Sequence, residues 1–316
     1  MCIRDRDNTR RIYLDNIRWI TVCIVVIYHV IYMYNGVQPF GVIGPFKEQQ
    51  LQDAFQYFVY PWMMALLFTV SGMTVRYYME KHNVKEFIRD KTRKLLVPST
   101  IGLFVFQWIL GYYNMKISGA LESFESVPGI VRDVIMAISG IGVLWYMQVL
   151  WIFSMLLLLV RKFERDRIWK KGEKTPVWLL VLLTVCVYGF SQVLNTSVVT
   201  VYRFGIYGFC FFTGYFIFSH DEVVERLSKW WGIFLIVAGA TGIFYTIYYF
   251  GENYAVAPVL NNLPACIYCW FLILAILAFM KKYGNAENKV SRWMLKKILG
   301  NLCFSLSSIG LRSLLP

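Results

Sequence analysis

Charged residues are scarce in this sequence, and no long hydrophilic stretch interrupts it. Only 16% of the 316 residues are Asp, Glu, Lys or Arg, whereas soluble domains contain about 25%. Hydrophobic residues make up 58% of the chain. The shortage of charge excludes an ordinary soluble protein, and the lack of a long polar segment leaves no room for a separate soluble domain.

The motifs of several enzyme classes are also missing. The chain has no GxxxxGK[ST], GxSxG or HExxH segment, so the NTPase, serine-hydrolase and zinc-protease classes have no support. Among the seven cysteines, Cys266 and Cys269 have the spacing of a metal or redox pair. No second pair and no histidine accompany them, so we expect both to act as small apolar residues. We predict no metal site and no cofactor.

What the sequence has instead is a series of apolar runs, each close to the ~20 residues that a helix needs to cross a bilayer. The runs are too long for β-barrel strands, which have ~10 residues of alternating polarity. Only helices satisfy their own backbone hydrogen bonds in lipid. We therefore predict an all-α, polytopic transmembrane helical bundle. Its expected crossings are residues 19–34, 55–78, 96–113, 143–160, 177–194, 203–219, 230–250 and 262–280, with a ninth that begins near Ile298.

The distribution of positive charge predicts the orientation of these crossings. Lys and Arg number 27 in the segments 1–18, 76–94, 161–174, 220–229 and 281–297, but only four in the alternate segments 35–53, 114–141, 195–203 and 251–261. Because positively charged loops stay cytoplasmic, we predict a cytoplasmic N-terminus. The net charge of +13 then reflects topology and contact with anionic lipid head groups rather than binding to nucleic acid.

The first crossing carries polar groups on one face. Arg18 and His29 are eleven residues apart, and at 100° per residue this leaves them only about 20° apart around a helix and roughly 16 Å apart along it. Asp15 is three residues before Arg18 and neighbours the same face. An arginine at a cytoplasmic helix end commonly snorkels to head groups. A histidine within a crossing is costly and marks function, unless it only bonds a neighbouring helix.

Other ionisable residues are expected to be ordinary surface groups. His82 and His220 fall in polar cytoplasmic loops, where we expect them to be solvated and assign them no role. Arg203 begins the crossing at 203–219 on its outer side, where contact with an anionic acceptor is one interpretation and snorkelling to the head groups is the expected behaviour.

The segment YLDNIRWITVCIVVIYHV, residues 13–30, resembles the opening of the acyltransferase family 3 membrane proteins, in particular the branch that includes glucan biosynthesis protein C. Leu14, Asp15, Arg18 and His29 match that family's Leu-Asp-x-x-Arg start and its Arg-x10-His pair. The resemblance covers roughly residues 11–280. It continues, in order, through MMALLFTVSGMTV (63–75), KTRKLLVP (91–98), LWYMQVLW (144–151) and FFTGYFIF (211–218).

Two features depart from the family pattern. The family often has an Arg-x-x-Arg pair before its third helix, whereas here those positions are Lys91 and Lys94, with Arg93 between them. A lysine neutralises phosphate but does not form the bidentate fork of arginine. The family has about ten helices, and the last is missing here. We expect a single transmembrane acyltransferase domain over residues 1–316, with 1–10 and 306–316 as non-native or truncated ends.

The resemblance implies an enzyme that moves an acetyl or succinyl-like group from cytosolic acyl-CoA, as co-substrate, to a hydroxyl of a cell-envelope glycan or lipid-linked sugar. His29 would be the general base, with an acyl-histidine relay as the competing mechanism. Arg18 and Asp15 would complete the catalytic face. Arg18, Lys91, Arg93 and Lys94 would bind the donor. The expected location is the inner (plasma) membrane of a bacterium.

Further groups are weaker candidates. Trp145 would stack on an acceptor sugar or act as an interfacial anchor. Tyr28, Tyr146 and Gln148 are possible stabilisers of the oxyanion. A transporter or flippase is an alternative function, because such proteins also place ionisable residues within the membrane. A non-catalytic membrane scaffold is another.

The predicted topology is testable by thiol labelling. A cysteine introduced within residues 40–50 should react with an impermeant thiol reagent on intact cells, because that segment lies in an outer loop. A cysteine introduced within 161–174 should react only after lysis. The reverse pattern would overturn both the topology and the cytosolic route of the donor.

Overall fold

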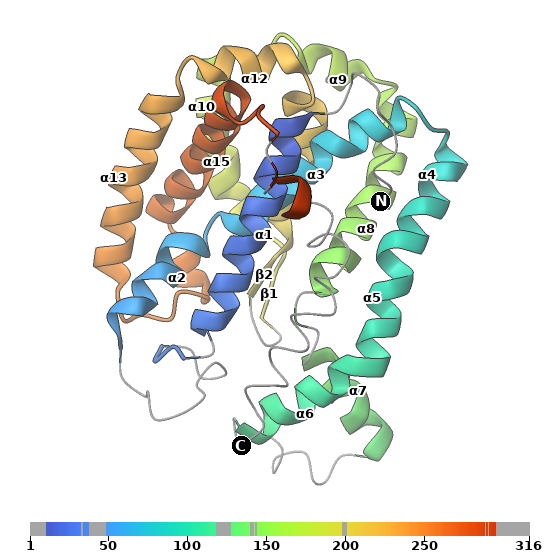
Figure 1. Cartoon of the computed structure of the whole chain (residues 1–316), viewed down its shortest axis with the longest axis vertical. Coiled ribbons are helices and arrows are strands. Elements are labelled where there is room, and N and C mark those ends of the chain that lie inside the picture. Colours follow the sequence, from blue (N-terminus) through green and yellow to red (C-terminus); the bar gives the residue numbers. More distant parts are fainter. Residues whose placement is uncertain are drawn as a thin grey trace.

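The apolar runs fold into helices packed in one bundle, as the computed structural model shows for residues 11–32, 34–37, 49–117, 128–139, 142, 144–197, 201–287, 289 and 291–294 (Figure 1). The eight predicted crossings correspond to α1 (Ile12–Tyr32), α2 with α3 (Ala54–Val59 and Met63–Met79), α5 with α6 (Val97–Gly102 and Trp108–Ile117), α8 (Leu144–Glu164), α10 (Val177–Ser191), α11 (Phe204–Thr213) with the turn Gly214–Phe218, α13 (Trp231–Tyr249) and α15 (Leu263–Tyr283).

The all-α prediction is confirmed. Among the described residues, five helical segments are long and apolar enough to cross a membrane: Ile12–Tyr32, Leu51–Met79, Leu144–Glu164, Trp231–Tyr249 and Leu263–Tyr283. Two shorter apolar helices, Val177–Ser191 and Phe204–Phe218, lie among them. The expected ninth crossing near Ile298 falls outside the described residues.

Short elements that the sequence pattern did not predict join the crossings. A two-stranded antiparallel hairpin pairs β1 (Asn195–Ser197) with β2 (Val201–Arg203). The remaining helices are the 3₁₀ turn Leu51–Asp53, α7 (Gly129–Ser139), α9 (Arg167–Gly172), α12 (Asp221–Ser228) and α14 (Ala257–Leu260). These elements are too short or too amphipathic to form long apolar runs, which is why the sequence pattern did not predict them.

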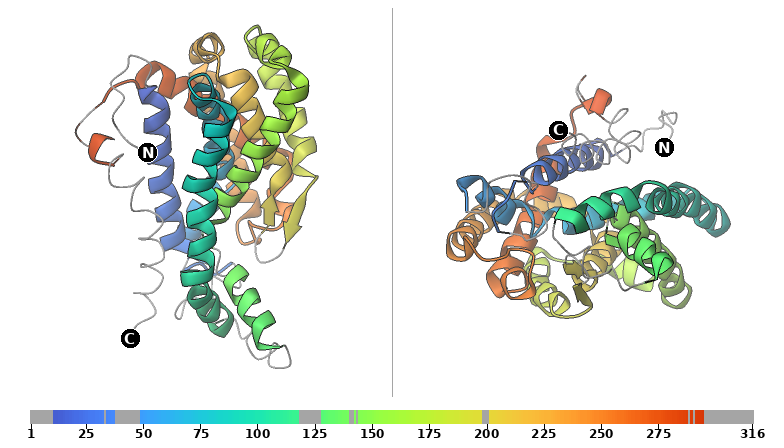
Figure 2. Two further views of the ribbon diagram at one scale, coloured as in Figure 1. Left: turned by 90° about the vertical axis from the view of Figure 1, so that its right-hand side faces the viewer. Right: turned by 90° about the horizontal axis from the view of Figure 1, so that it is seen from below.

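A long helix with two widened turns contains the third crossing. It runs through α4 (Val84–Lys91), α5 (Val97–Gly102) and α6 (Trp108–Ile117), which are joined by π turns at Thr92–Leu96 and Leu103–Gln107. Pro98 follows the first π turn. A proline inside a helix lacks an N–H and clashes with the carbonyl four residues earlier, so the wider turn allows the helix to continue. Figure 2 shows α6 and α7 extending beyond the other helices.

Two glycines bring the helix α3 close to α11 and the turn that follows it. A Cβ atom at Gly72 would collide with the Phe211 carbonyl oxygen, and one at Gly214 would collide with the Thr69 carbonyl oxygen. Small residues at a membrane helix interface allow backbones to approach in this way. The close approach fixes α3, which faces α1, in the middle of the bundle.

A buried network joins the helix ends on one side. Arg76 is only 8% exposed, and its Nη1 donates to Asp166 Oδ1 at 2.8 Å and to the Tyr215 hydroxyl at 3.2 Å. The Trp169 ring lies 3.8 Å from the guanidinium. His220 stacks on the same tryptophan at 4.3 Å. Its Nε2 bonds the Trp169 carbonyl oxygen at 2.8 Å.

The expectation of a solvated His220 is therefore wrong, because that side chain is 5% exposed. The expectation of a snorkelling Arg203 is also wrong. Arg203 is 1% exposed, and it donates to Asn261 Oδ1 at 2.9 Å and to the Pro61 and Leu260 carbonyl oxygens at 3.3 Å each. Breaks in two neighbouring helix pairs leave these carbonyl groups without helical partners, and the guanidinium satisfies them.

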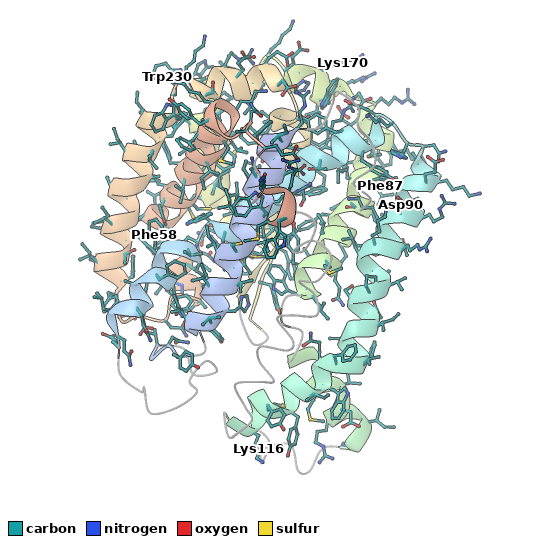
Figure 3. The ribbon with its side chains drawn as sticks, in the orientation of Figure 1. Phe58, Phe87, Asp90, Lys116, Lys170 and Trp230 are labelled. Atoms are coloured by element: carbon teal, nitrogen blue, oxygen red, sulfur yellow. The ribbon has the colours of Figure 1, made fainter. Side chains whose placement is uncertain are left out.

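The loops rich in Lys and Arg lie at one end of the bundle, and the loops with few of these residues lie at the other. Figure 3 shows Lys170 and Trp230 at one end and Lys116 at the other. This separation is what the charge pattern requires. Which end faces the cytosol stays a prediction, and the ends are called cytoplasmic and outer on that basis below.

Candidate functional site

The helix α1 is continuous from Ile12 to Tyr32, so the eleven-residue spacing of Arg18 and His29 has the consequence expected from the sequence. Arg18 and His29 therefore share one face, with roughly 16 Å between them along the axis. Arg18 is near the cytoplasmic end, and His29 is about three turns deeper.

Arg18 is bound to both its own helix and α3. Its Nη2 donates to Thr74 Oγ1, and its Nη1 lies 3.7 Å from Asp15 Oδ1. The Thr74 hydroxyl donates its own hydrogen to the Val70 carbonyl oxygen at 2.8 Å, so its lone pairs are oriented to accept from the guanidinium. The arginine is partly exposed and held in place, unlike a side chain that snorkels freely.

Lys91 lies close enough to Arg18 for the two charges to interact. Burial, with the neighbouring positive charges of Arg18 and Lys94, lowers the pKa of Lys91 to about 8, and Asp90 acts in the opposite direction. The Asp90 carboxylate is already engaged, since it bonds Lys94 Nζ at 2.6 Å and the Tyr78 hydroxyl at 2.8 Å. Arg18 and Lys91 thus form a region of excess positive charge at the cytoplasmic end of α1.

The predicted donor cluster is divided by this arrangement. Lys91 is half-buried and near Arg18, whereas Arg93 and Lys94 are exposed. The π turn begins at Thr92, directly after Lys91. The three cations therefore do not form one surface. Lys91 stands with Arg18, and Lys94 pairs with Asp90.

Several polar groups on α3 and α8 join this region, and of these only Tyr146 was named as a candidate from the sequence. Ser71 is three residues from Thr74 and so lies one turn deeper on the same face of α3. Its hydroxyl is 2.8 Å from that of Tyr146, which also lies 3.3 Å from the Leu67 carbonyl oxygen. Trp151 Nε1 donates to Thr92 Oγ1 at 3.0 Å.

The only signals for these groups were the Ser-Gly pair in the 63–75 segment and the aromatic 144–151 segment. Their positions give a series of polar groups that begins at Arg18 and Thr74 and continues inward to Ser71 and Tyr146.

His29 has a defined tautomer. Its Nδ1 lies 2.7 Å from the Val25 carbonyl oxygen, and a carbonyl oxygen only accepts, so Nδ1 carries the hydrogen. In the neutral ring, Nε2 then holds the lone pair. No described residue bonds Nε2, and the side chain is partly exposed. The Tyr28 ring meets the imidazole edge-on at 5.2 Å. The arrangement leaves one basic nitrogen available to a substrate.

The three residues expected to stabilise the oxyanion differ in position. The Tyr28 side chain is buried, with its hydroxyl 3.3 Å from that of Tyr254. Gln148 is two residues from Tyr146 on α8, about 200° around the helix, so the two side chains cannot line one site. Tyr146 is the candidate that lies with the polar groups of α3.

Trp145 belongs to an aromatic cluster. Its ring centroid lies 5.1 Å from that of Tyr202, 5.6 Å from Tyr207 and 6.2 Å from Phe68. The tryptophan is partly buried. It therefore lies between α8, α11 and the hairpin, which is a different position from that of an isolated interfacial anchor.

Metal-binding clusters are absent from the part of the chain that the structure describes. Cys266 and Cys269 are buried in α15, and the Cys266 thiol lies 3.3 Å from the Ser191 hydroxyl. Both cysteines are free thiols.

Comparison with known proteins adds one finding. A family model described as an acyltransferase domain matches residues 11–307, which include every residue of the site above. No curated protein and no solved structure matches the chain.

The positive charge of Lys91 should lower the free energy of unfolding of the ligand-free protein, and this effect can be tested. Replacing Lys91 by Met should raise the Tm of the ligand-free protein at pH 7, because it removes a charge held near Arg18. An unfolded chain keeps the lysine charged up to its ordinary pKa of 10.5. The destabilisation of the folded protein by charged Lys91 is therefore largest below pH 8, and it decreases as the pH rises from 8 toward 10.5. Thermal unfolding in detergent should show a larger gain at pH 7 than at about pH 9.5.

The exposed Arg93 provides the control, and Arg93→Met should change the Tm little at either pH. A lower Tm for Lys91→Met at both pH values would show that Lys91 stabilises the fold, and would contradict this account.

Proposed function

Because the chain belongs to the acyltransferase family whose domain its residues 11–307 match, we propose that it moves an acetyl or succinyl-like group from cytosolic acyl-CoA to a hydroxyl of a cell-envelope glycan or lipid-linked sugar. The protein is a multi-pass membrane acyltransferase. The donor, the acceptor and a place in the bacterial inner membrane belong to the proposal, as does membership of the glucan biosynthesis protein C branch.

One observation carries the proposal. A region of excess positive charge lies at the cytoplasmic end of α1, and a histidine with an available Nε2 lies deeper on the same face. The chemical groups of acyl-CoA match this arrangement. A polyanionic nucleotide at one end suits the positive region, and a long thin pantetheine arm carries the thioester at the other end toward the histidine. The nucleotide would stay at the membrane surface while the thioester approaches His29.

The donor phosphates would relieve an unfavourable contact. Burial, with the neighbouring positive charge of Arg18, disfavours the charged form of Lys91 in the free protein and lowers its pKa. An anion placed between them interacts favourably with both charges and favours protonated Lys91. Arg18 supplies a planar guanidinium that suits phosphate oxygens. Arg93 and Lys94, on the exposed side, would act at longer range on the approaching anion.

His29 would act as the general base. Its Nε2 takes the proton of the acceptor hydroxyl while the oxygen attacks the thioester carbonyl. A carbon–oxygen bond forms, the carbon–sulfur bond breaks, and the proton is returned to the coenzyme A thiolate that leaves. The Nδ1–H bond to Val25 fixes the ring orientation and the tautomer. In the competing relay, Nε2 itself attacks the thioester and then passes the acyl group to the acceptor.

Two further groups have supporting positions. The paired hydroxyls of Ser71 and Tyr146 are candidates to donate hydrogen bonds to the developing oxyanion, because they extend the polar series inward from Arg18. Trp145, with Tyr202 and Tyr207, offers aromatic rings at the outer side that can stack on a sugar.

The role of His29 is tested by replacing it with Ala. Loss of a general base lowers rates by ~10²–10⁴, so His29→Ala should lose most acyl transfer in a purified acyl-CoA assay. Folding should persist, because alanine favours the helix. Gel filtration in detergent checks this point.

The position of the imidazole provides the control. A histidine moved to position 28 or 30 in the His29→Ala background turns by about 100° and should not restore activity. Arg18→Lys keeps the charge and loses the fork, so a partial loss is expected. An active His29→Ala protein would exclude this mechanism and favour a transporter or a scaffold.

The role of Lys91 is tested through the donor KM. Lys91→Met should raise the KM for acyl-CoA, since a lost contact with phosphate costs on the order of 1–3 kcal/mol, and should change the acceptor KM less. Arg93→Met should have a smaller effect, because Arg93 is exposed. If both variants keep the donor KM while protein yield falls, the cations determine topology only.

A further inference from the structure

An apolar groove lies between α1, α3, α13 and α15, away from the polar face of α1. Its volume is about 320 Å³. Hydrocarbon side chains line it, including Ile20 and Ile24 of α1, Leu235 of α13, and Ile276 and Phe279 of α15. Thr21 also borders it, but its hydroxyl donates to the Ile17 carbonyl oxygen at 2.7 Å. Water needs two to four polar partners, and this lining offers none.

The groove occupies the cytoplasmic half of the bundle. Its α1 residues run from Ile17 to Ile24, over about 10 Å of helix. Its α13 and α15 residues, Trp231 and Met280 among them, lie near the helix ends where Figure 3 shows Trp230. Around α1, the groove-lining positions are turned by roughly 110° from Arg18 and His29. The groove therefore lies to one side of the face that carries the proposed site.

Aromatic side chains lie at the cytoplasmic mouth of the groove, and two exposed lysines adjoin them in the sequence. The Trp231 ring lies 5.4 Å from that of Phe279 and 5.8 Å from that of Tyr283. Lys282 Nζ lies 5.2 Å from the Tyr283 ring centroid, and Lys229 is two residues before Trp231. Neither lysine makes an ion pair with a described residue. Aromatic rings with lysines at this depth are typical of contact with phospholipid head groups.

We infer that the groove binds one acyl chain of an anionic phospholipid from the cytoplasmic leaflet, with the head-group phosphate at Lys229 and Lys282. The apolar lining matches the chain, and the two cations match the phosphate. The bound lipid packs against one side of α1 and so supports the helix that carries Arg18 and His29. The inference does not depend on the reaction that the protein performs.

The experiment uses the full chain in nanodiscs that contain phosphatidylglycerol and phosphatidylcholine, followed by transfer to mild detergent and mass spectrometry of the retained lipid. Two variants, Ile20→Trp and Leu235→Trp, fill the groove from positions whose side chains are 36% and 45% exposed. Ile243→Trp, on the same helix as Leu235 but outside the groove, is the control. Retained phosphatidylglycerol should fall about fourfold for each methylene kept out of the groove.

The head-group contact is tested separately. Lys229→Gln with Lys282→Gln should weaken retention of phosphatidylglycerol about fivefold for each charge and leave phosphatidylcholine unchanged. Lys170→Gln with Lys171→Gln removes the same charge from another part of the cytoplasmic end, and should have little effect. Gel filtration confirms that each variant is folded.

Three outcomes would overturn the inference. One is equal retention in the groove-filling variants and the Ile243→Trp control. Another is an equal loss in the two lysine pairs, which would indicate general surface attraction. The third is a disulfide between a cysteine at position 276 and one introduced within residues 298–316, which would show that the chain's own C-terminal segment covers the groove.

Discussion

The interaction between the positive charges of Arg18 and Lys91 is the constraint on which the site depends. A charge that faces lipid is costly, and polar groups on α3 and α1 hold the Arg18 side chain. Thr74 accepts from Arg18, and Asp15 lies near it on the same helix. Burial, together with the neighbouring positive charges of Arg18 and Lys94, lowers the pKa of Lys91 to about 8. A polyanionic donor would remove this imbalance.

The helix α3 links the charged end to the interior. Its Thr74 and Ser71 present hydroxyls on one face, toward Arg18 and Tyr146 respectively. That face is fixed because the opposite contact, at Gly72 against the Phe211 carbonyl group, leaves no room for a side chain. The packing of α3 against α11 therefore sets where the polar groups of the site lie relative to α1.

The fold class and the α1 stripe could be predicted because both follow from local patterns. An apolar run of ~20 residues has few structures open to it in lipid, and an eleven-residue spacing fixes an angle within any unbroken helix. The donor cluster was less predictable. Lys91, Arg93 and Lys94 are close in sequence, but the π turn that starts at Thr92 and the approach of Arg18 separate Lys91 from the other two.

The sequence by itself determined the crossings, their alternating charge, and the alignment of Arg18 with His29, because each depends on residues within one segment. Only the tertiary structure decided which polar groups are buried and what they contact. Arg203 and His220 read as surface residues, yet carbonyl groups of helices distant in sequence enclose Arg203 and the Trp169 ring covers His220. Burial depends on how separate helices pack against one another, and that packing has no signature within a single segment.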